Sequence, residues 1–126
     1  MAAPNIVNVA TITGITTWKA GINTEGAGVS VIVTNAASSG KVLKVNSLVA
    51  TGIGETTGVT TKIFNKAAGV GNSVSIGTTM SVLTFSSLAV VSKDMSLYLQ
   101  EDQSIGVFKQ SGLGDIDVVC CYEDIS

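Results

Sequence analysis

Apolar and polar residues alternate over much of this chain, most clearly between residues 82 and 108. An apolar run at 88–91 precedes two runs in which every second residue is apolar, and the alternating residues are Met95, Leu97, Leu99, Ile105 and Val107. Polar segments at 92–94 and 100–103 separate the runs. A period of two is typical of β-strands with one buried face. The pattern predicts three strands of a central hairpin system, with the five alternating residues in the core.

Shorter runs of the same kind predict strands along the rest of the chain. They cover residues 6–13, 15–20, 29–34, 43–49, 59–64, 74–76 and 115–123. Gly14 is expected to separate the first two strands, and 74–76 is expected to be a short edge strand. In the 43–49 strand, Val49 is expected to share a face with Leu43 and Val45 because the alternation continues.

The strand pattern defines an all-β fold class. No segment combines a helical period with an N-cap and a terminal glycine. About eight to ten short strands, spaced at intervals typical of sandwiches, predict a single-domain antiparallel β-sandwich over residues 1–126. The Gly-rich segments 21–28 and 51–58 are expected to carry the chain between two sheets, as in a jelly-roll or Greek-key arrangement.

The composition indicates what kind of surface the protein has. Only 13% of the 126 residues are charged and the net charge is −2, while the chain holds 14 glycines. The exposed faces must therefore be polar but largely neutral, which favours a homo-oligomer or another assembly over an isolated monomer. All basic residues are lysines, and the pI is about 4.8. No basic footprint for nucleic acid is expected.

The N-terminal sequence has neither the basic start nor the continuous apolar run of a secretory signal. Nor does any run approach the roughly 20 apolar residues of a membrane-spanning helix. We therefore expect no membrane partner. The product is expected to be made in a cytoplasm and to stay there unless it leaves as part of a particle.

Cys120 and Cys121 are the first candidates for chemistry. Neighbouring residues of a strand point to opposite faces, so the two thiols cannot readily share one metal ion. The chain contains no histidine and no other cysteine to complete such a site. We expect one thiol to pack in the core with Ile116 and Val118, and the other to face outward.

The acidic pairs are weaker candidates. Asp115 and Asp117 share one face of a predicted strand and could contact a hard cation, but no spaced calcium-loop motif or third ligand accompanies them. Glu101 and Asp102 fall where a turn needs polar residues. The absence of histidine also leaves serine and cysteine without the usual general base. We expect no catalytic residue, no metal and no cofactor.

Six aromatic residues are spread along the chain, and most are expected to fill the core. Trp18 is the exception, because polar residues flank it near one end of the sequence. It is the candidate anchor of a protein interface.

Four segments carry a family resemblance: NIVNVATITG at 5–14, VTNAASSGKVLKVNSLVATGI at 33–53, VVSKDMSLYLQEDQSIGV at 90–107 and DIDVVCCYEDIS at 115–126. They resemble a group of small virion structural proteins of marine tailed phages, notably cyanophages. The resemblance implies a structural role in a viral particle and supplies no catalytic or binding residues.

Three hypotheses follow from the resemblance and the composition. The first is a capsid decoration, or cement, protein that binds the major capsid protein on the outer head surface and stabilises the shell. The second is another virion component at the neck, tail, baseplate or fibre. The third is a carbohydrate-binding β-sandwich used in host attachment, for which Trp18 or Tyr98 would have to be exposed.

Overall fold

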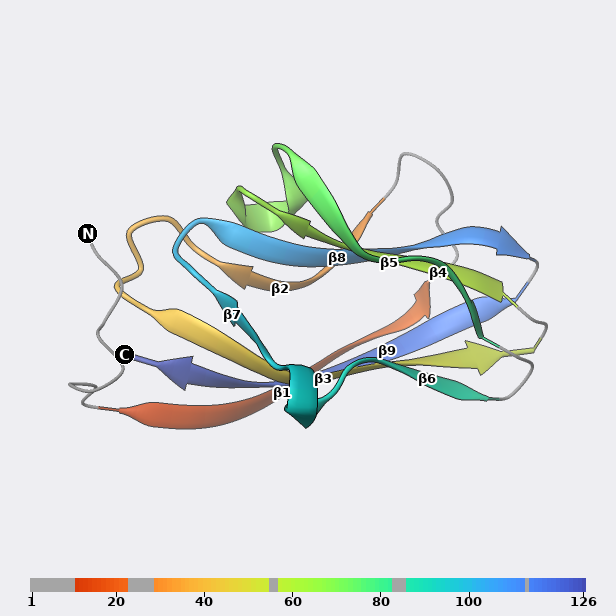
Figure 1. Ribbon diagram of the computed structural model, residues 1–126, viewed down its shortest axis with the longest axis horizontal. Helices are drawn as coiled ribbons and strands as arrows, with labels where there is room; N and C mark the ends of the chain where they lie inside the picture. The colour runs from red at the N-terminus through yellow and green to blue at the C-terminus, as the bar shows by residue number, and fades with distance from the viewer. Residues whose placement is uncertain (1–10, 23–28, 55–56, 83–85, 113) are drawn as a thin grey trace.

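A computed structural model describes residues 11–22, 29–54, 57–82, 86–112 and 114–126. Two antiparallel sheets face each other in this part of the chain (Figure 1). Sheet A contains β1 (Ile12–Ile22), β9 (Asp115–Ile125), β3 (Val42–Ile53) and β6 (Ser87–Val91) in that order, and β7 (Leu97–Leu99) also pairs with β3. Sheet B contains β2 (Ser30–Asn35), β8 (Gln103–Gly112), β4 (Thr57–Phe64) and β5 (Ser73–Val82). Single 3-10 turns, η2 (Ala67–Gly69) and η3 (Lys93–Met95), complete the described elements.

The chain crosses between the sheets at most of its connections. Counting β6 and β7 as one interrupted strand, each sheet has four strands, and the neighbours of most strands along the chain lie in the opposite sheet. This is a jelly-roll arrangement. The fold class predicted from the alternation is confirmed. The Gly-rich segments at 21–28 and 51–58 do connect strands of different sheets.

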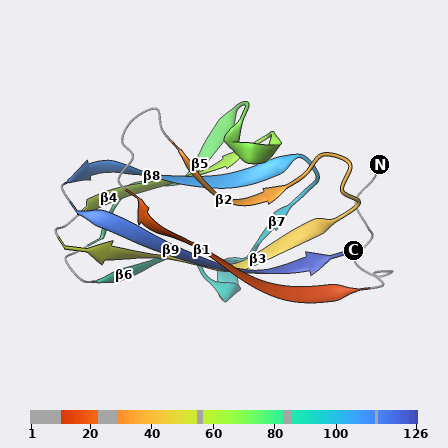
Figure 2. The ribbon, with the colours of Figure 1, turned by 180° about the vertical axis from the view of Figure 1, so that it is seen from behind.

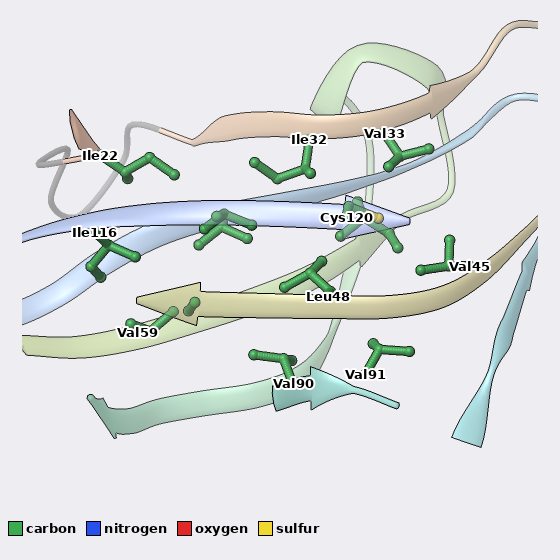
Figure 3. Packing of buried hydrophobic residues seen from close by; sticks show 14 of the residues in the cluster. Ile22, Ile32, Val33, Val45, Leu48, Val59, Val90, Val91, Ile116 and Cys120 are labelled. Atoms are coloured by element: carbon green, nitrogen blue, oxygen red, sulfur yellow. The ribbon is translucent and has the colours of Figure 1, made fainter. Parts of the chain in front are cut away.

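The core fills the space between the sheets (Figure 3). Leu48 and Val118 from sheet A and Ile105 from sheet B have no exposed surface. These side chains are branched and apolar, as a pleated surface between two sheets requires. Of the five residues predicted to be buried in the central stretch, Leu99, Ile105 and Val107 are fully buried and Leu97 packs partly against the core.

Met95 does not belong to the core, and its side chain is 67% exposed. It lies in η3, where its backbone N–H donates to the carbonyl of Ser92 at 2.9 Å. The connection is therefore two residues longer than the alternation suggested, and the strand begins at Leu97. The predicted hairpin system is also wrong, because β6 and β7 pair with β3 in sheet A while β8 lies in sheet B.

A β-bulge in β3 overturns the predicted face of Val49. The pairing with β9 shifts between Val45 and Ser47, so Asn46 is an extra residue. An extra residue inverts the side chains that follow it. Leu48 consequently joins Val45 in the core, and Val49 points to the outer side of sheet A.

Three predicted boundaries were also wrong. Gly14 does not break the chain, because β1 runs through it and pairs it with Glu123. Residues 51–53 belong to β3 rather than to the following loop. The strand predicted at 74–76 is an edge strand, as expected, but it extends from Ser73 to Val82. Of the predicted strand at 6–13, residues 6–10 lie outside the described part of the chain.

Candidate assembly interface

β1 forms one edge of sheet A, and among the described residues it pairs with β9 alone (Figure 2). Eight consecutive residues, Ile12 to Lys19, pair with Ile125 to Val118 without a register shift. Just before this span, Thr11 and Ser126 exchange two backbone hydrogen bonds of 3.1 and 3.0 Å. Such reciprocal pairs alternate along an antiparallel ladder with pairs that exchange none.

This alternation fixes which backbone groups of β1 face outward. Counting from Thr11, the residues that exchange hydrogen bonds with β9 are Thr13, Ile15, Thr17 and Lys19. The N–H and C=O groups of Ile12, Gly14, Thr16 and Trp18 therefore point away from β9. Together they form a straight row of donors and acceptors, which we call the β1 edge, and such a row can receive another strand.

The other described edges are shorter or less regular. β2 has six residues and a register shift between Val31 and Val33. β5 is longer, but its pairing with β4 shifts twice between Val59 and Lys62. β6 and β7 together make an edge that η3 interrupts. Short and irregular edges resist strand addition, whereas long regular ones invite it.

The outer face of sheet A carries an apolar band that crosses all four strand positions. Trp18 of β1 lies opposite Val119 of β9, Val119 lies opposite Val49 of β3, and Val49 lies opposite Ala89 of β6. Trp18 is 70% exposed and Val119 is 43% exposed. Exposed apolar residues in one contiguous row are typical of a protein interface.

Small and mostly uncharged residues flank the apolar band. On one side lie Thr16, Cys121 and Ser47, which are paired across the strands in the same way. On the other side Asp117 lies opposite Thr51, whose hydroxyl is 3.0 Å from that of Ser87. The composition predicted the neutral polar rim but not the apolar strip that it surrounds; the two together are typical of a protein interface.

The aromatic residues divide between core and surface. Trp18 is exposed as predicted, and Phe64 and Phe108 are buried. Tyr98 is 44% exposed on β7, opposite Lys44. Three strand spacings, or about 14 Å, separate β7 from β1, so Trp18 and Tyr98 cannot hold one sugar ring between them.

The two cysteines point to opposite faces, as predicted. Both are free; Cys120 has no exposed surface, whereas Cys121 is half-buried, with its Sγ 3.6 Å from the Thr16 hydroxyl. Burial, together with the nearby Cys121, raises the pKa of the Cys120 thiol to about 12. Cys120 is therefore a small apolar core residue.

This arrangement predicts one reactive thiol in the folded protein. At pH 8, a thiol reagent such as DTNB should modify about one cysteine per chain quickly, and the second only in denaturant. Cys121→Ser should remove the fast reaction with little loss of stability. Fast modification of two thiols in the native protein would show that Cys120 is not enclosed.

Asp117 and Asp102, one residue from each of the two candidate acidic pairs, have structural partners, whereas Glu101 Oε1 is buried without a hydrogen-bond partner among the described residues. Asp117 Oδ1 accepts a hydrogen bond from the Gly21 N–H at 2.8 Å, near the end of β1, where Gly21 has a φ of 63°. Asp102 accepts from the Ala67 N–H and pairs with Lys66, each at 3.0 Å. No group of three or more potential metal ligands occurs among the described residues.

Asp102 holds the η2 segment against the start of β8. The hydrogen bond from Ala67 and the Lys66 ammonium lower the pKa of its carboxyl group from 3.8. Its contribution to stability should therefore be present at neutral pH and lost as the pH falls below 3.8 through the folded-state pKa.

Asp102→Asn should be mild, with Tm lowered by less than about 3 °C at pH 7. The amide oxygen can still accept from Ala67, and asparagine tolerates the φ of 61° found here. Asp102→Ala is the matched control and should cost more, because alanine accepts no hydrogen bond and fits that φ poorly. Equal Tm values for the two variants would contradict this role.

No protein-family model and no curated protein matches the sequence significantly. Among solved structures, the fold is similar to a chain from Bacillus endospore appendages, which form a novel family of disulfide-linked pili. The TM-score is 0.52 with 16% sequence identity, over 92% of this chain and 88% of that chain. At this identity the likeness establishes a shared fold. The resemblance to marine phage proteins stays a prediction.

Trp18 was predicted from the sequence, but the rest of the apolar band was not. The signal for Val119 was present, since it alternates with the buried Val118 and Cys120 and must point outward. Val49 could not be assigned to the outer face because of the bulge at Asn46, and Ala89 could not be assigned to the band because the pairing of β6 was unknown.

Among the described residues, no helix is long and apolar enough to span a membrane.

Proposed function

We propose that this protein is a structural subunit that works in contact with other protein chains in an ordered assembly. The observation that carries the proposal is the β1 edge with the apolar band beside it. In an isolated chain the outward backbone groups and the 70% exposed Trp18 face water. A second chain that covers them would bury apolar surface and complete the hydrogen bonds.

The fold similarity supports the same class of function. The similar solved chain comes from disulfide-linked pili, although the two sequences share only 16% identity. The two cysteines here lie on β9, and one of them is enclosed in the core. The proposed assembly therefore depends on noncovalent contacts rather than on a disulfide network.

Within this class, we propose a virion subunit that decorates the outside of a phage head and binds the major capsid protein. The segments that resemble marine phage proteins and the neutral polar rim of sheet A support this finer proposal. A decoration protein stabilises a shell by repeated contacts, so each contact can be weak.

Light scattering on the purified full-length chain, from about 1 to 100 µM, tests the general proposal. The mass should rise to a multiple of 12.8 kDa, and electron microscopy should show either defined oligomers or particles. A chain that stays monomeric at the highest concentration, and is absent from any particle of the producing organism, would overturn it.

Cryo-electron microscopy of the virion tests the decoration role. Density for this chain should lie on the outer head surface, with a copy number that follows the head lattice. Six or twelve copies at a single vertex would place it at the neck, tail or baseplate instead. Binding on a glycan array, abolished by Trp18→Ala, would favour host attachment.

A further inference from the structure

We propose that two copies of this protein pair through their β1 strands, antiparallel, about a two-fold axis at Ile15. The two sheets A would then form one continuous sheet. This inference rests on the proposed structural function and specifies the contact that the subunit makes first. Four observations on the described residues support it: the outward backbone groups, the two faces of the strand, the position of the charge and the place where the regular register ends.

The backbone of β1 is self-complementary in this arrangement. With the axis at Ile15, the outward groups of Ile12 face those of Trp18 of the second copy, and Gly14 faces Thr16 of the second copy. The reverse pairs follow by symmetry, which makes four facing pairs. Since each such pair exchanges two hydrogen bonds, the contact contains about eight.

The outer face supplies an apolar contact at each end of the pairing. Ile12 and Trp18 lie on this face with 57% and 70% of their surface exposed. Each Trp18 would lie across from an Ile12 of the second copy, within cross-strand contact distance. Gly14 between them leaves open space, since a Cβ built there has no atom within 4 Å. The indole ring can therefore lie flat over the neighbouring strand.

The inner face is compatible with the same register. Ile15 meets Ile15 of the second copy at the axis, and Thr13 meets Thr17 of the second copy. Lys19, the charged residue of β1, lies opposite Thr11 of the second copy, so no like charges face each other. If the pairing between the two copies shifted by two residues in either direction, Ile12 of one copy would no longer lie opposite Trp18 of the second copy.

The protective features of this edge begin where the proposed pairing ends. Lys19 follows Trp18, and the register of β1 shifts between Lys19 and Ile22, next to Gly21 with its φ of 63°. Lysines and bulges commonly block strand addition. The unprotected span, Ile12 to Trp18, is about 23 Å long at roughly 3.3 Å per residue.

The contact area estimated from the length of the strand indicates a weak dimer. A strip about 23 Å long and about 20 Å wide, the depth of two packed sheets with their side chains, buries about 900 Å² in total. This is below the roughly 1,000 Å² that a stable specific interface is expected to exceed, and it is typical of weak or transient contacts. Dimerisation is therefore expected in the micromolar range, and repeated contacts in a larger assembly would strengthen it.

Cysteine cross-linking tests the register. Ile15→Cys, made with Cys121→Ser, should give a disulfide-linked dimer when diamide oxidises the two thiols, because facing residues of this kind have Cα atoms about 4.5 Å apart. Thr13→Cys alone should not cross-link. A mixture of Thr13→Cys and Thr17→Cys chains should do so. Efficient linkage of Thr13→Cys alone, or none for Ile15→Cys, would overturn the register.

Thr16→Pro tests the backbone hydrogen bonds. The Thr16 N–H faces away from β9, so proline should leave the fold intact, as circular dichroism can verify, while removing two of the intermolecular hydrogen bonds. The dimer dissociation constant should rise at least tenfold. Thr16→Ala retains the N–H, so its dimer dissociation constant should stay within about threefold of that of the parent chain.

The outcomes separate this inference from the proposed function. If the parent chain assembles but Ile15→Cys does not cross-link and Thr16→Pro assembles normally, the β1 pairing is wrong and the structural function stands. If the parent chain is monomeric and absent from particles, both are wrong. Cross-linking of Ile15→Cys together with loss of the dimer in Thr16→Pro would support both.

Discussion

Val118→Asp is expected to prevent the protein from folding into a soluble form. Val118 has no exposed surface and lies in the middle of β9, between β1 and β3. A carboxylate there would have to be charged without a partner or be protonated at neutral pH, at a cost above about 4 kcal/mol. That is a large part of the 5–15 kcal/mol that stabilises a typical domain. The soluble fraction after expression and the far-UV circular dichroism spectrum measure the effect.

Val119→Asp is the matched control for this variant. Val119 is the next residue of the same strand but points outward and is 43% exposed. The substitution should change the free energy of unfolding by less than about 1 kcal/mol. A soluble Val118→Asp protein that melts like Val119→Asp would contradict the assignment of the two faces. Leu97→Asp should be milder, although the alternation placed Leu97 in the core, because Leu97 is only partly buried.

Asn35→Ala should give the second largest loss of stability, about 2 to 4 kcal/mol. Asn35 ends β2 and is 2% exposed. Its Nδ2 donates to the carbonyls of Lys41 and Leu99, at 2.9 and 3.1 Å, and so connects the end of β2 in sheet B to the last residue of β7 and to the residue that precedes β3. Alanine would leave the buried carbonyl of Leu99 without this donor. Thermal unfolding should show Tm lowered by roughly 10 °C.

Ser39→Ala tests the hydrogen bond at the amide oxygen of Asn35 separately from those at the amide nitrogen. The Ser39 hydroxyl donates to Asn35 Oδ1 at 2.6 Å, nearer the surface. Its removal should cost only about 1 kcal/mol, because the carbonyl contacts of Nδ2 remain. If Asn35→Ala were no more destabilising than Ser39→Ala, the connection between the sheets would not depend on this amide.

The fold was predictable wherever the alternation continues unbroken through a buried strand. In β9, Ile116, Val118 and Cys120 occupy the inner face as the pattern indicates. The prediction failed at Val49, because a single extra residue inverts the faces and leaves no mark in the sequence. It failed at Met95 because this apolar residue continues the spacing of Leu97 and Leu99 although it lies in the 3-10 turn η3.

The candidate interface was only partly predictable for a different reason. Trp18 is conspicuous as an aromatic residue among polar neighbours. The apolar band, however, is assembled from β1, β9, β3 and β6, which are far apart in the sequence. No local pattern contains the pairing of distant strands. The outward direction of the Thr16 N–H depends on the same pairing, since it follows from the hydrogen bonds between Thr11 and Ser126.

The interruption of β6 and β7 by η3 limits how far sheet A can grow. The dimer proposed above would have an eight-stranded sheet whose two outer margins are both this interrupted edge. Strand addition would therefore stop at two copies, and the sheet would not polymerise into a fibre. Any larger assembly must then grow through a second, chemically different contact. Dimerisation through β1 and growth through the second contact should then begin at different protein concentrations, and the number of subunits in the assembly should be even.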